Sequence, residues 1–221
     1  MVSAQVALIV CVLVIRSGHG SEAALNNVLA TRHGAHESGA CSLPRASYTL
    51  QKPVALGDIS SLRQLKYTNA MCGHVLTVDC GHGPLDVIVV NSNLGGGLDL
   101  YASAWNQATG NAPPGQTKCS VQLSGRNPIQ GGGPRCYYAP DSEMDNAWFR
   151  MVGVFNVGAR MVTGATLNGV AGAFNGVQPY FAFQGGPIGG DGQVVFSFND
   201  GSKFATRLRN CIREQAKQMW S

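Results

Sequence analysis

Residues 87–105 read VIVVNSNLGGGLDLYASAW. The four apolar residues Val87–Val90 are bounded by polar ones, which is typical of a buried strand. Polar residues and the run Gly95–Gly97 follow, a composition that favours a turn and leaves the backbone open to close approach by another molecule. Asp99 then precedes a short helical pattern at 101–109, which is the position of a helix N-cap. A strand, an open bend and one carboxylate together predict the floor of a binding groove.

The first residues carry the pattern of a secretory signal. Val6–Ile15 is an apolar run that is too short to span a bilayer but typical of a signal-peptide core, and small and polar residues follow it. We therefore expect residues 1–23 to be a signal peptide and the mature protein to be secreted, extracellular and free of the membrane. A membrane anchor is the alternative, and no second apolar run supports it. Residues 24–38, low in apolar content, are expected to form a leader.

Cysteine usage agrees with secretion. Cys11 would leave with the signal peptide, and an even number of cysteines in a secreted chain indicates three disulfides. The six are Cys41, Cys72, Cys80, Cys119, Cys136 and Cys211. Six cysteines allow 15 pairings; the one favoured here is Cys119 with Cys136, because a Gly/Pro-rich loop separates two extended segments. Buried free thiols are the alternative.

Neither a metal nor a cofactor is expected. No pair of cysteines has the C-x2-C spacing of a zinc module, and His74 and His82 do not supply it. His33 and His36 lie in the polar N-terminal segment. Both histidine pairs are interpreted as solvated or structural.

Composition favours an all-β chain of two domains. The 221 residues include 29 glycines and only 13% charged residues, and short apolar runs alternate with turn residues. The net charge of +4 is low for a nucleic-acid-binding protein, so no such partner is expected, and a monomer is assumed. The turn-rich link 109–116 separates a domain at 39–112 from one at 113–211, and residues 212–221 form a tail.

The order of motifs in residues 39–112 resembles the first domain of expansins and expansin-like proteins. The resemblance rests on Gly39-x-x-Ser42, Ala55-Leu56, Cys72-Gly73, the strands at Val75 and Val87, and Leu98-Asp99-Leu100. It implies a six-stranded double-psi β-barrel. In this family an immunoglobulin-like β-sandwich that binds polysaccharide follows the barrel, and the short strand-like segments after residue 116 fit such a domain.

The resemblance also implies the groove residues. Expansins carry two aspartates, a hydroxyl residue and an aromatic in the barrel groove. Asp99 corresponds to the second aspartate and is the candidate groove acid, while the first falls on Asn91, the aromatic on Asn93 and the hydroxyl on Ser42. Glycoside hydrolysis normally needs two carboxyl groups, so the single carboxylate argues against a hydrolase. A plain N-cap is the alternative role for Asp99.

In the second domain, the aromatic platform of the family corresponds to Trp148, Phe149 and Tyr180. Flat aromatic faces suit the apolar C–H faces of sugars. The alternative is that these side chains are core, because neighbours on a strand face opposite sides, so at least one of Trp148 and Phe149 is expected to pack inside.

The resemblance therefore implies a secreted protein, not an enzyme, that binds cell-wall polysaccharide and loosens the wall without hydrolysis. Cellulose or another β-glucan is the expected partner, with xyloglucan and pectin as further candidates. Two alternatives stay open. One is a wall-binding protein of defence or virulence without loosening activity, and the other is a residual glycosidase or lytic transglycosylase acting through Asp99.

Overall fold

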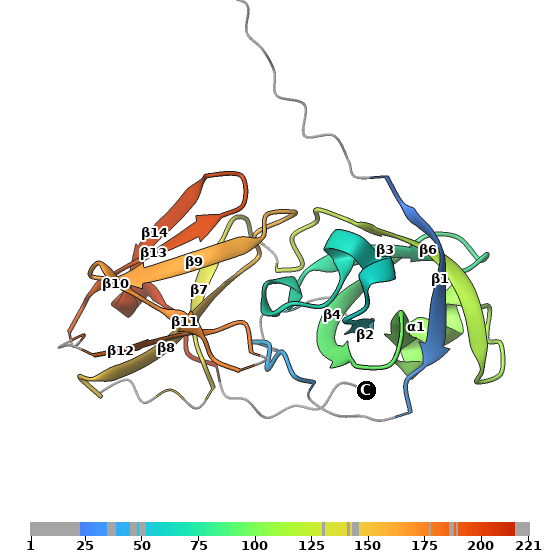
Figure 1. Cartoon of the computed structure of the whole chain (residues 1–221), viewed down its shortest axis with the longest axis horizontal. Helices are drawn as coiled ribbons and strands as arrows, with labels where there is room; N and C mark the ends of the chain where they lie inside the picture. The colour runs from blue at the N-terminus through green and yellow to red at the C-terminus, as the bar shows by residue number, and fades with distance from the viewer. Residues whose placement is uncertain are drawn as a thin grey trace, which may run out of the picture.

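The structure is a computed structural model that describes residues 23–34, 39–44, 48, 52–129, 131–140, 142, 146–176, 178–185, 188 and 190–214. The expected signal peptide lies outside these ranges except for its last residue, as does most of the expected tail. Among the described residues, no helix is long and apolar enough to cross a membrane. Figure 1 shows two β-rich domains side by side, with the N-terminal half of the chain in one and the C-terminal half in the other.

The first domain is a closed six-stranded barrel with the strand order β1-β5-β2-β4-β3-β6. Its strands are β1 (Leu25–Arg32), β2 (Pro53–Gly57), β3 (Val75–Asp79), β4 (Leu85–Asn93), β5 (Leu98–Leu100) and β6 (Gln116–Leu123). The pairs β1–β5 and β2–β4 are parallel and the others antiparallel. The connections hold the 3-10 turns η1 (Ser60–Leu65) and η2 (Asn69–Met71) and the helix α1 (Ala102–Ala108).

The predicted strand at Val87–Val90 is confirmed, and it continues to Asn93. All four apolar residues are fully buried, because α1 contacts β4 and the neighbouring barrel strands. A strand covered on both faces reads as a continuous apolar run rather than an alternation. Trp105 anchors α1: its ring is buried, and its indole N–H donates to the carbonyl of Ala112 at 2.9 Å.

The second domain is a sandwich of two four-stranded sheets, ordered β10-β9-β13-β14 and β11-β12-β8-β7. The strands are β7 (Arg135–Tyr138), β8 (Phe149–Phe155), β9 (Val162–Leu167), β10 (Val170–Ala171), β11 (Ala173–Phe174), β12 (Phe181–Gln184), β13 (Gln193–Phe198) and β14 (Lys203–Arg207), followed by the 3-10 turn η3 (Leu208–Asn210). Alternate residues such as Val152, Phe183 and Phe196 fill the space between the sheets. The all-β class, the barrel and the sandwich are thus confirmed.

The barrel extends beyond the expected boundaries at both ends. The expected leader, 24–38, contains β1, and the expected second domain contains β6. Strand β1 lies between β5 and β6 and closes the barrel. It was not recognised because only Val28 and Ala30 are buried in the core, and Leu25 is the one further apolar residue that packs against it. Its pairing partners lie far along the chain, where sequence pattern gives no signal.

The disulfides connect Cys41 with Cys72, Cys80 with Cys119, and Cys136 with Cys211. All six cysteines are paired, as expected. The favoured pair Cys119–Cys136 is wrong, because Cys119 lies on β6 of the barrel and Cys136 on β7 of the sandwich. Two bridges staple the barrel and one staples the sandwich, and none crosses between them.

The two domains share one buried cluster. Tyr48, Tyr137, Phe155 and Tyr180 meet there, with Phe155 in edge-to-face contact with each of the three tyrosines. Polar contacts also cross the boundary, and Asn69 donates to the carbonyl of Gln178 at 2.8 Å. An apolar interface of this kind fixes the relative position of the barrel and the sandwich.

Candidate functional site: a polar row on the barrel and an exposed tryptophan on the sandwich

Four residues on neighbouring barrel strands lie directly opposite one another. Thr31 on β1 pairs with Asp99 on β5, Asp99 with Ala55 on β2, and Ala55 with Asn91 on β4. Residues opposed across a sheet place their side chains on the same face. Because neighbouring strands are about 4.8 Å apart, the Cα atoms of Asp99 and Asn91 are roughly 10 Å apart. We call Thr31, Asp99 and Asn91 the polar row.

Asp99 is the best-connected member of the polar row. Thr31 Oγ1 donates to its Oδ1 at 2.7 Å, and His33 Nδ1 lies 2.7 Å from its Oδ2. The side chains of His33 and Asp99 are only 15% and 20% exposed. Hydrogen bonds to a charged carboxylate are short and strong, so Thr31 and His33 hold this group in one orientation while part of it still faces solvent.

The N-cap alternative for Asp99 is wrong. Asp99 lies inside β5, the N-cap of α1 is Tyr101, and no side chain caps this helix. The Tyr101 ring instead packs against the imidazole of His33, with the ring centroids 4.3 Å apart. The aromatic contact and the carboxylate together fix the His33 ring on two sides.

Sequence reasoning missed Thr31 and His33. Both residues are placed beside Asp99 by β1. Thr31 is in register with Asp99, and His33, two positions further along the chain, lies on the same face because alternate residues of a strand share a face. The family resemblance places the hydroxyl on Ser42, and the low apolar content of residues 24–38 predicts that His33 belongs to a leader. A period-two pattern of buried Val28 and Ala30 before Thr31 was the signal available, and it is weak because β1 carries only two core residues.

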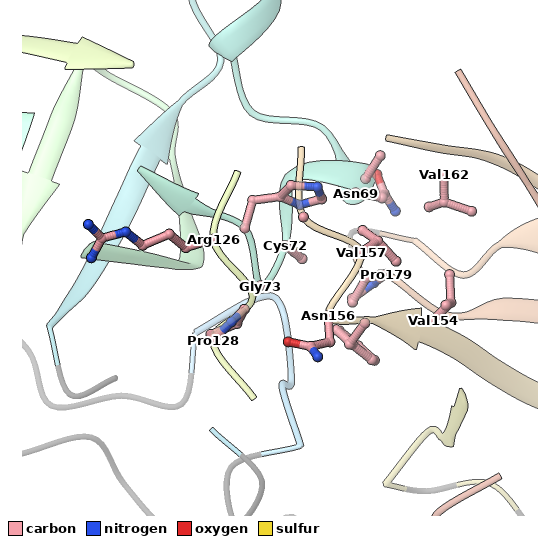
Figure 2. Close-up of a pocket in the computed structure, with 14 residues that line it drawn as sticks. Asn69, Cys72, Gly73, Arg126, Pro128, Val154, Asn156, Val157, Val162 and Pro179 are labelled. Atoms are coloured by element: carbon pink, nitrogen blue, oxygen red, sulfur yellow. The ribbon is translucent and has the colours of Figure 1, made fainter. Parts of the chain in front are cut away.

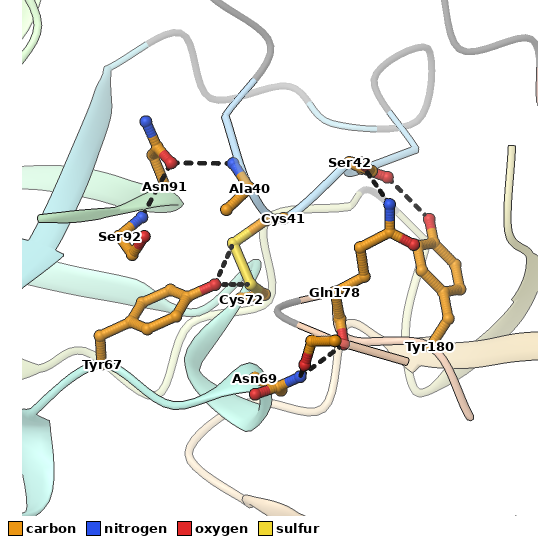
Figure 3. Close-up of a disulfide and its surroundings, with 11 residues drawn as sticks. Ala40, Cys41, Ser42, Tyr67, Asn69, Cys72, Asn91, Ser92, Gln178 and Tyr180 are labelled. Carbon is orange, nitrogen blue, oxygen red and sulfur yellow. Dashed lines mark hydrogen bonds between the residues drawn. A yellow bond between two sulfur atoms is a disulfide. The ribbon is translucent and has the colours of Figure 1, made fainter. Parts of the chain in front are cut away.

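Asn91 and Asn93 bind the backbone through their side-chain oxygens. Asn91 Oδ1 accepts from the N–H of Ala40 at 2.8 Å and of Ser92 at 2.9 Å (Figure 3). The N–H of Cys41 donates to the carbonyl of Val90 beside it. Asn93 Oδ1 accepts from the N–H of Gly95 at 3.2 Å. Asn91 therefore holds the segment 39–42 against β4, and Asn93 shapes the glycine turn.

Ser42 is not brought to the polar row. It lies at the domain boundary, where its Oγ accepts from Gln178 Nε2 at 3.3 Å and its carbonyl accepts from the hydroxyl of Tyr180 at 2.8 Å. Figure 3 shows the short segment through Ala40 and Ser42 between Asn91 on one side and the sandwich residues on the other. The hydroxyl beside the Asp99 carboxylate is thus that of Thr31.

Of the three aromatic residues expected to form the platform, only Trp148 is well exposed. Trp148 is 66% exposed just before β8, Phe149 is partly buried at the start of β8, and Tyr180 is 0% exposed. Tyr180 as an exposed sugar contact is therefore wrong, because its ring belongs to the cluster between the domains. The expectation that one of Trp148 and Phe149 packs inside agrees with Phe149 contacting that cluster.

The cavity between the domains is too small for a substrate. It measures about 10 Å³ and is lined by residues of both domains, including Asn69, Asn156 and Pro179 (Figure 2). Such a volume holds one water at most. His74 lines it, and its Nε2 lies 3.0 Å from the carbonyl oxygen of Arg160. Burial lowers the pKa of His74 from its usual value, so this histidine is a structural part of the boundary.

The barrel carboxylates other than Asp99 are held elsewhere. Asp86 pairs with Arg126 at 2.7 Å, Asp58 with Lys66 at 3.5 Å, and Asp79 accepts from the N–H groups of Gly81 and Gly83. Within the ranges that the structure describes, no group of three or more His, Cys, Asp or Glu side chains could hold a metal ion.

The sequence matches no family model and no curated protein. Among the solved structures that resemble the chain, two are of the expansin from Clavibacter michiganensis. A mutant in complex with cellohexaose has a TM-score of 0.63 and 18% identity, and the match covers 89% of this chain and 95% of that chain. The apo form has a TM-score of 0.64 and 17% identity over the same shares. The protein therefore has the two-domain expansin fold, a double-psi β-barrel followed by a β-sandwich.

Proposed function

We propose that this protein is a secreted, monomeric, expansin-like protein that binds β-glucan chains of a cell wall and loosens their contacts without hydrolysis. The observation that carries the proposal is Asp99, a carboxylate that is 20% exposed and held by Thr31 and His33. A preorganised acceptor of this kind suits a sugar hydroxyl, because little freedom is lost when the donor arrives. The cellohexaose found with a similarly folded protein supports a glucan as the ligand.

The composition of the polar row supports a non-hydrolytic role. Hydrolysis of a glycosidic bond normally uses two carboxyl groups about 5–10 Å apart on either side of the bond. At the far end of the row stands Asn91, whose oxygen is bonded to backbone N–H groups and cannot serve as an acid or base. Asp79 and Asp86, the remaining nearby candidates in sequence, have partners of their own.

Trp148 provides the second contact in this proposal. An exposed indole is costly to leave in water and binds the apolar face of a sugar ring well. Because the interface between the domains is apolar and continuous, the distance between Trp148 and the polar row is fixed. A polymer that reaches both sites gains from multivalency without ordering a linker.

The test is a pull-down of the purified protein on insoluble cellulose, chitin and pectin-rich wall. We expect wild type to bind cellulose and Trp148→Ala to bind on the order of tenfold more weakly, the effect of ~1.4 kcal/mol. Asp99→Asn keeps the shape of the side chain and should also weaken binding. An exposed side chain on β14 of the sandwich, Lys203, offers the control Lys203→Ala.

Two further measurements separate the alternatives. Release of reducing sugar from soluble glucan by wild type, lost in Asp99→Asn, would establish a glycosidase or transglycosylase and contradict the proposal. Extension of a clamped wall strip distinguishes a loosening protein from one that only binds. Binding without extension would leave the wall-binding alternative, and no binding to any polymer would remove the carbohydrate function.

A further inference from the structure

A hollow of about 530 Å³ opens on the barrel. Its walls are the first half of β1, the turn η1 and the bend between β4 and β5. The lining includes Asn26, Asn27, Leu29, Ser61, Arg63 and the run Gly95–Gly97. The volume lies within the range of small-ligand sites, roughly 300–1,000 Å³. None of these residues belongs to the polar row.

The hollow is continuous with the polar row through two strands. Leu29 precedes Thr31 by two positions on β1, and Gly97 precedes Asp99 by two positions in the segment that leads through β5. Residues two apart on a strand share a face, and Gly97 lies against the backbone of Leu29. A ligand that contacts Asp99 and extends toward the start of these strands therefore enters the hollow.

The fold requires glycine at Gly97 but not at Gly95 or Gly96. A Cβ on Gly97 would lie 2.3 Å from the carbonyl oxygen of Leu29, so packing requires glycine there. A Cβ on Gly95 would meet nothing within 4 Å, and one on Gly96 would make only an ordinary contact with Asn93 at 3.5 Å. Neither Gly95 nor Gly96 has a positive φ. Neither backbone conformation nor packing explains these two glycines, whereas close approach of a ligand to the main chain does.

The chemistry of the lining fits a neutral sugar. It contains no carboxylate, and its one charged side chain, Arg63, is exposed. Leu29 is 41% exposed on the floor and offers an apolar surface to a sugar ring. Asn26, Asn27 and Ser61 supply side chains that can both donate and accept hydrogen bonds.

From these observations we propose that the hollow is a glucosyl-binding subsite for the same neutral β-glucan chain that contacts Asp99. The inference rests on the proposed function and extends it by placing additional sugar units on the side of Gly95 and Gly96. The side chains missing at these two positions leave the subsite open. Recognition is by shape and hydrogen bonding, with no charge on the ligand.

The experiment compares the affinities of cellotriose and cellohexaose for wild type, Gly95→Leu, Gly96→Leu and the double variant, measured by calorimetry. A leucine at either position projects from the bend and narrows the hollow, and the open surroundings allow it to fold. Gly164→Leu is the matched control, because Gly164 lies on β9 of the sandwich, also has nothing within 4 Å and has no positive φ. Urea unfolding midpoints should be the same for all five proteins.

We expect wild type and Gly164→Leu to bind cellohexaose more tightly than cellotriose. The double variant should lose this gain on the order of tenfold, the effect of ~1.4 kcal/mol, and keep wild-type affinity for cellotriose. Equal affinities of the double variant and wild type for both sugars would overturn the subsite and leave the proposed function standing. Equal weakening for both sugars would overturn it as well, because the bend would then act on the polar row.

Two further parts of the experiment distinguish failure of the subsite from failure of the proposed function. If wild type binds neither sugar and Asp99→Asn changes nothing, the proposed function fails and the subsite with it. Polygalacturonate tests the neutrality of the occupant. If wild type binds polygalacturonate, Arg63→Gln abolishes that binding, and cellohexaose does not compete, then the hollow takes an acidic polymer and the inference is wrong.

Discussion

The polar row of the barrel and the aromatic residues of the sandwich differ in how the fold places them. In the barrel, neighbouring strands hold Thr31, Asp99 and Asn91 in register, so the three side chains lie on one face. In the sandwich, Trp148 is exposed whereas Tyr180 is buried. Asp99 and Asn91 were expected from the family resemblance, as were Trp148 and Tyr180, whereas Thr31 was not. The side chains of the polar row lie together because the pairing of the backbone strands fixes their positions. An aromatic platform is more easily lost, since any apolar ring is stabilised by whichever surface covers it, and here the barrel covers Tyr180.

Removing a disulfide from each domain gives the largest expected effects and asks whether the domains unfold together. Cys136 and Cys211 are 75 residues apart, and Cys41 and Cys72 are 31 apart. Chain entropy gives about 4.5 kcal/mol for a loop of the first size and about 3.7 kcal/mol for the second. The Cys136→Ala/Cys211→Ala and Cys41→Ala/Cys72→Ala proteins should show these losses of unfolding free energy in urea titrations. Two separate transitions in either variant would contradict a shared core.

The difference in burial between Tyr180 and Trp148 can be tested by replacing each residue with alanine. Tyr180→Ala removes a fully buried ring and its bond to Ser42, so it should lower the free energy of unfolding by about 3–5 kcal/mol. Trp148→Ala removes an exposed ring and should change it by less than about 0.5 kcal/mol. Chemical denaturation of the two variants, followed by circular dichroism, measures both. Similar losses in the two would mean that Trp148 is structural and would weaken its assigned role in binding.

The polar row can be tested by removing the partners of Asp99 one at a time. Thr31→Val keeps the shape of the side chain and removes a hydrogen bond to a carboxylate, so the expected loss of stability is about 1–2 kcal/mol. His33→Gln keeps a donor and should lose less, while His33→Ala removes both the donor and the contact with Tyr101. Glucan affinity, measured on each variant, should fall for Thr31→Val and His33→Ala and be largely kept by His33→Gln. Unchanged affinity in all three would show that the orientation of Asp99 is irrelevant to binding.

The smallest expected effect is a pH dependence at the domain boundary. Burial lowers the pKa of His74 in the folded protein, so below its ordinary value near 6.5 the unfolded chain binds more protons than the folded one. The free energy of unfolding should therefore fall as the pH drops from about 6.5 toward the folded pKa, by at most about 1.4 kcal/mol per pH unit. His74→Asn should remove this part of the slope. Urea titrations across the acidic range measure it, and identical slopes for wild type and His74→Asn would contradict the assignment.

Much of the fold was predictable because residues 87–105 contain both a recognisable strand pattern and the candidate acid Asp99. The buried run at Val87–Val90 and the Leu98-Asp99-Leu100 motif contributed to the resemblance that implied the barrel, and the strand-like segments after residue 116 fitted the sandwich that it also implied. The candidate acid Asp99 was found in the same way. The aromatic assignment failed at Tyr180, because an apolar ring has the same sequence signature whether it is exposed for binding or buried at a boundary.

Composition, period-two patterning and short motifs, which are local, predicted the all-β class, the two domains and the pairing of all six cysteines within disulfides. The family resemblance added Asp99 as the candidate acid. The three-dimensional structure was needed to show that β1 completes the barrel, which cysteines pair, and that Thr31 and His33 hold Asp99. Each of these joins segments that are distant in the chain, and register between distant strands is fixed by pairing and packing of the whole barrel rather than by any local pattern.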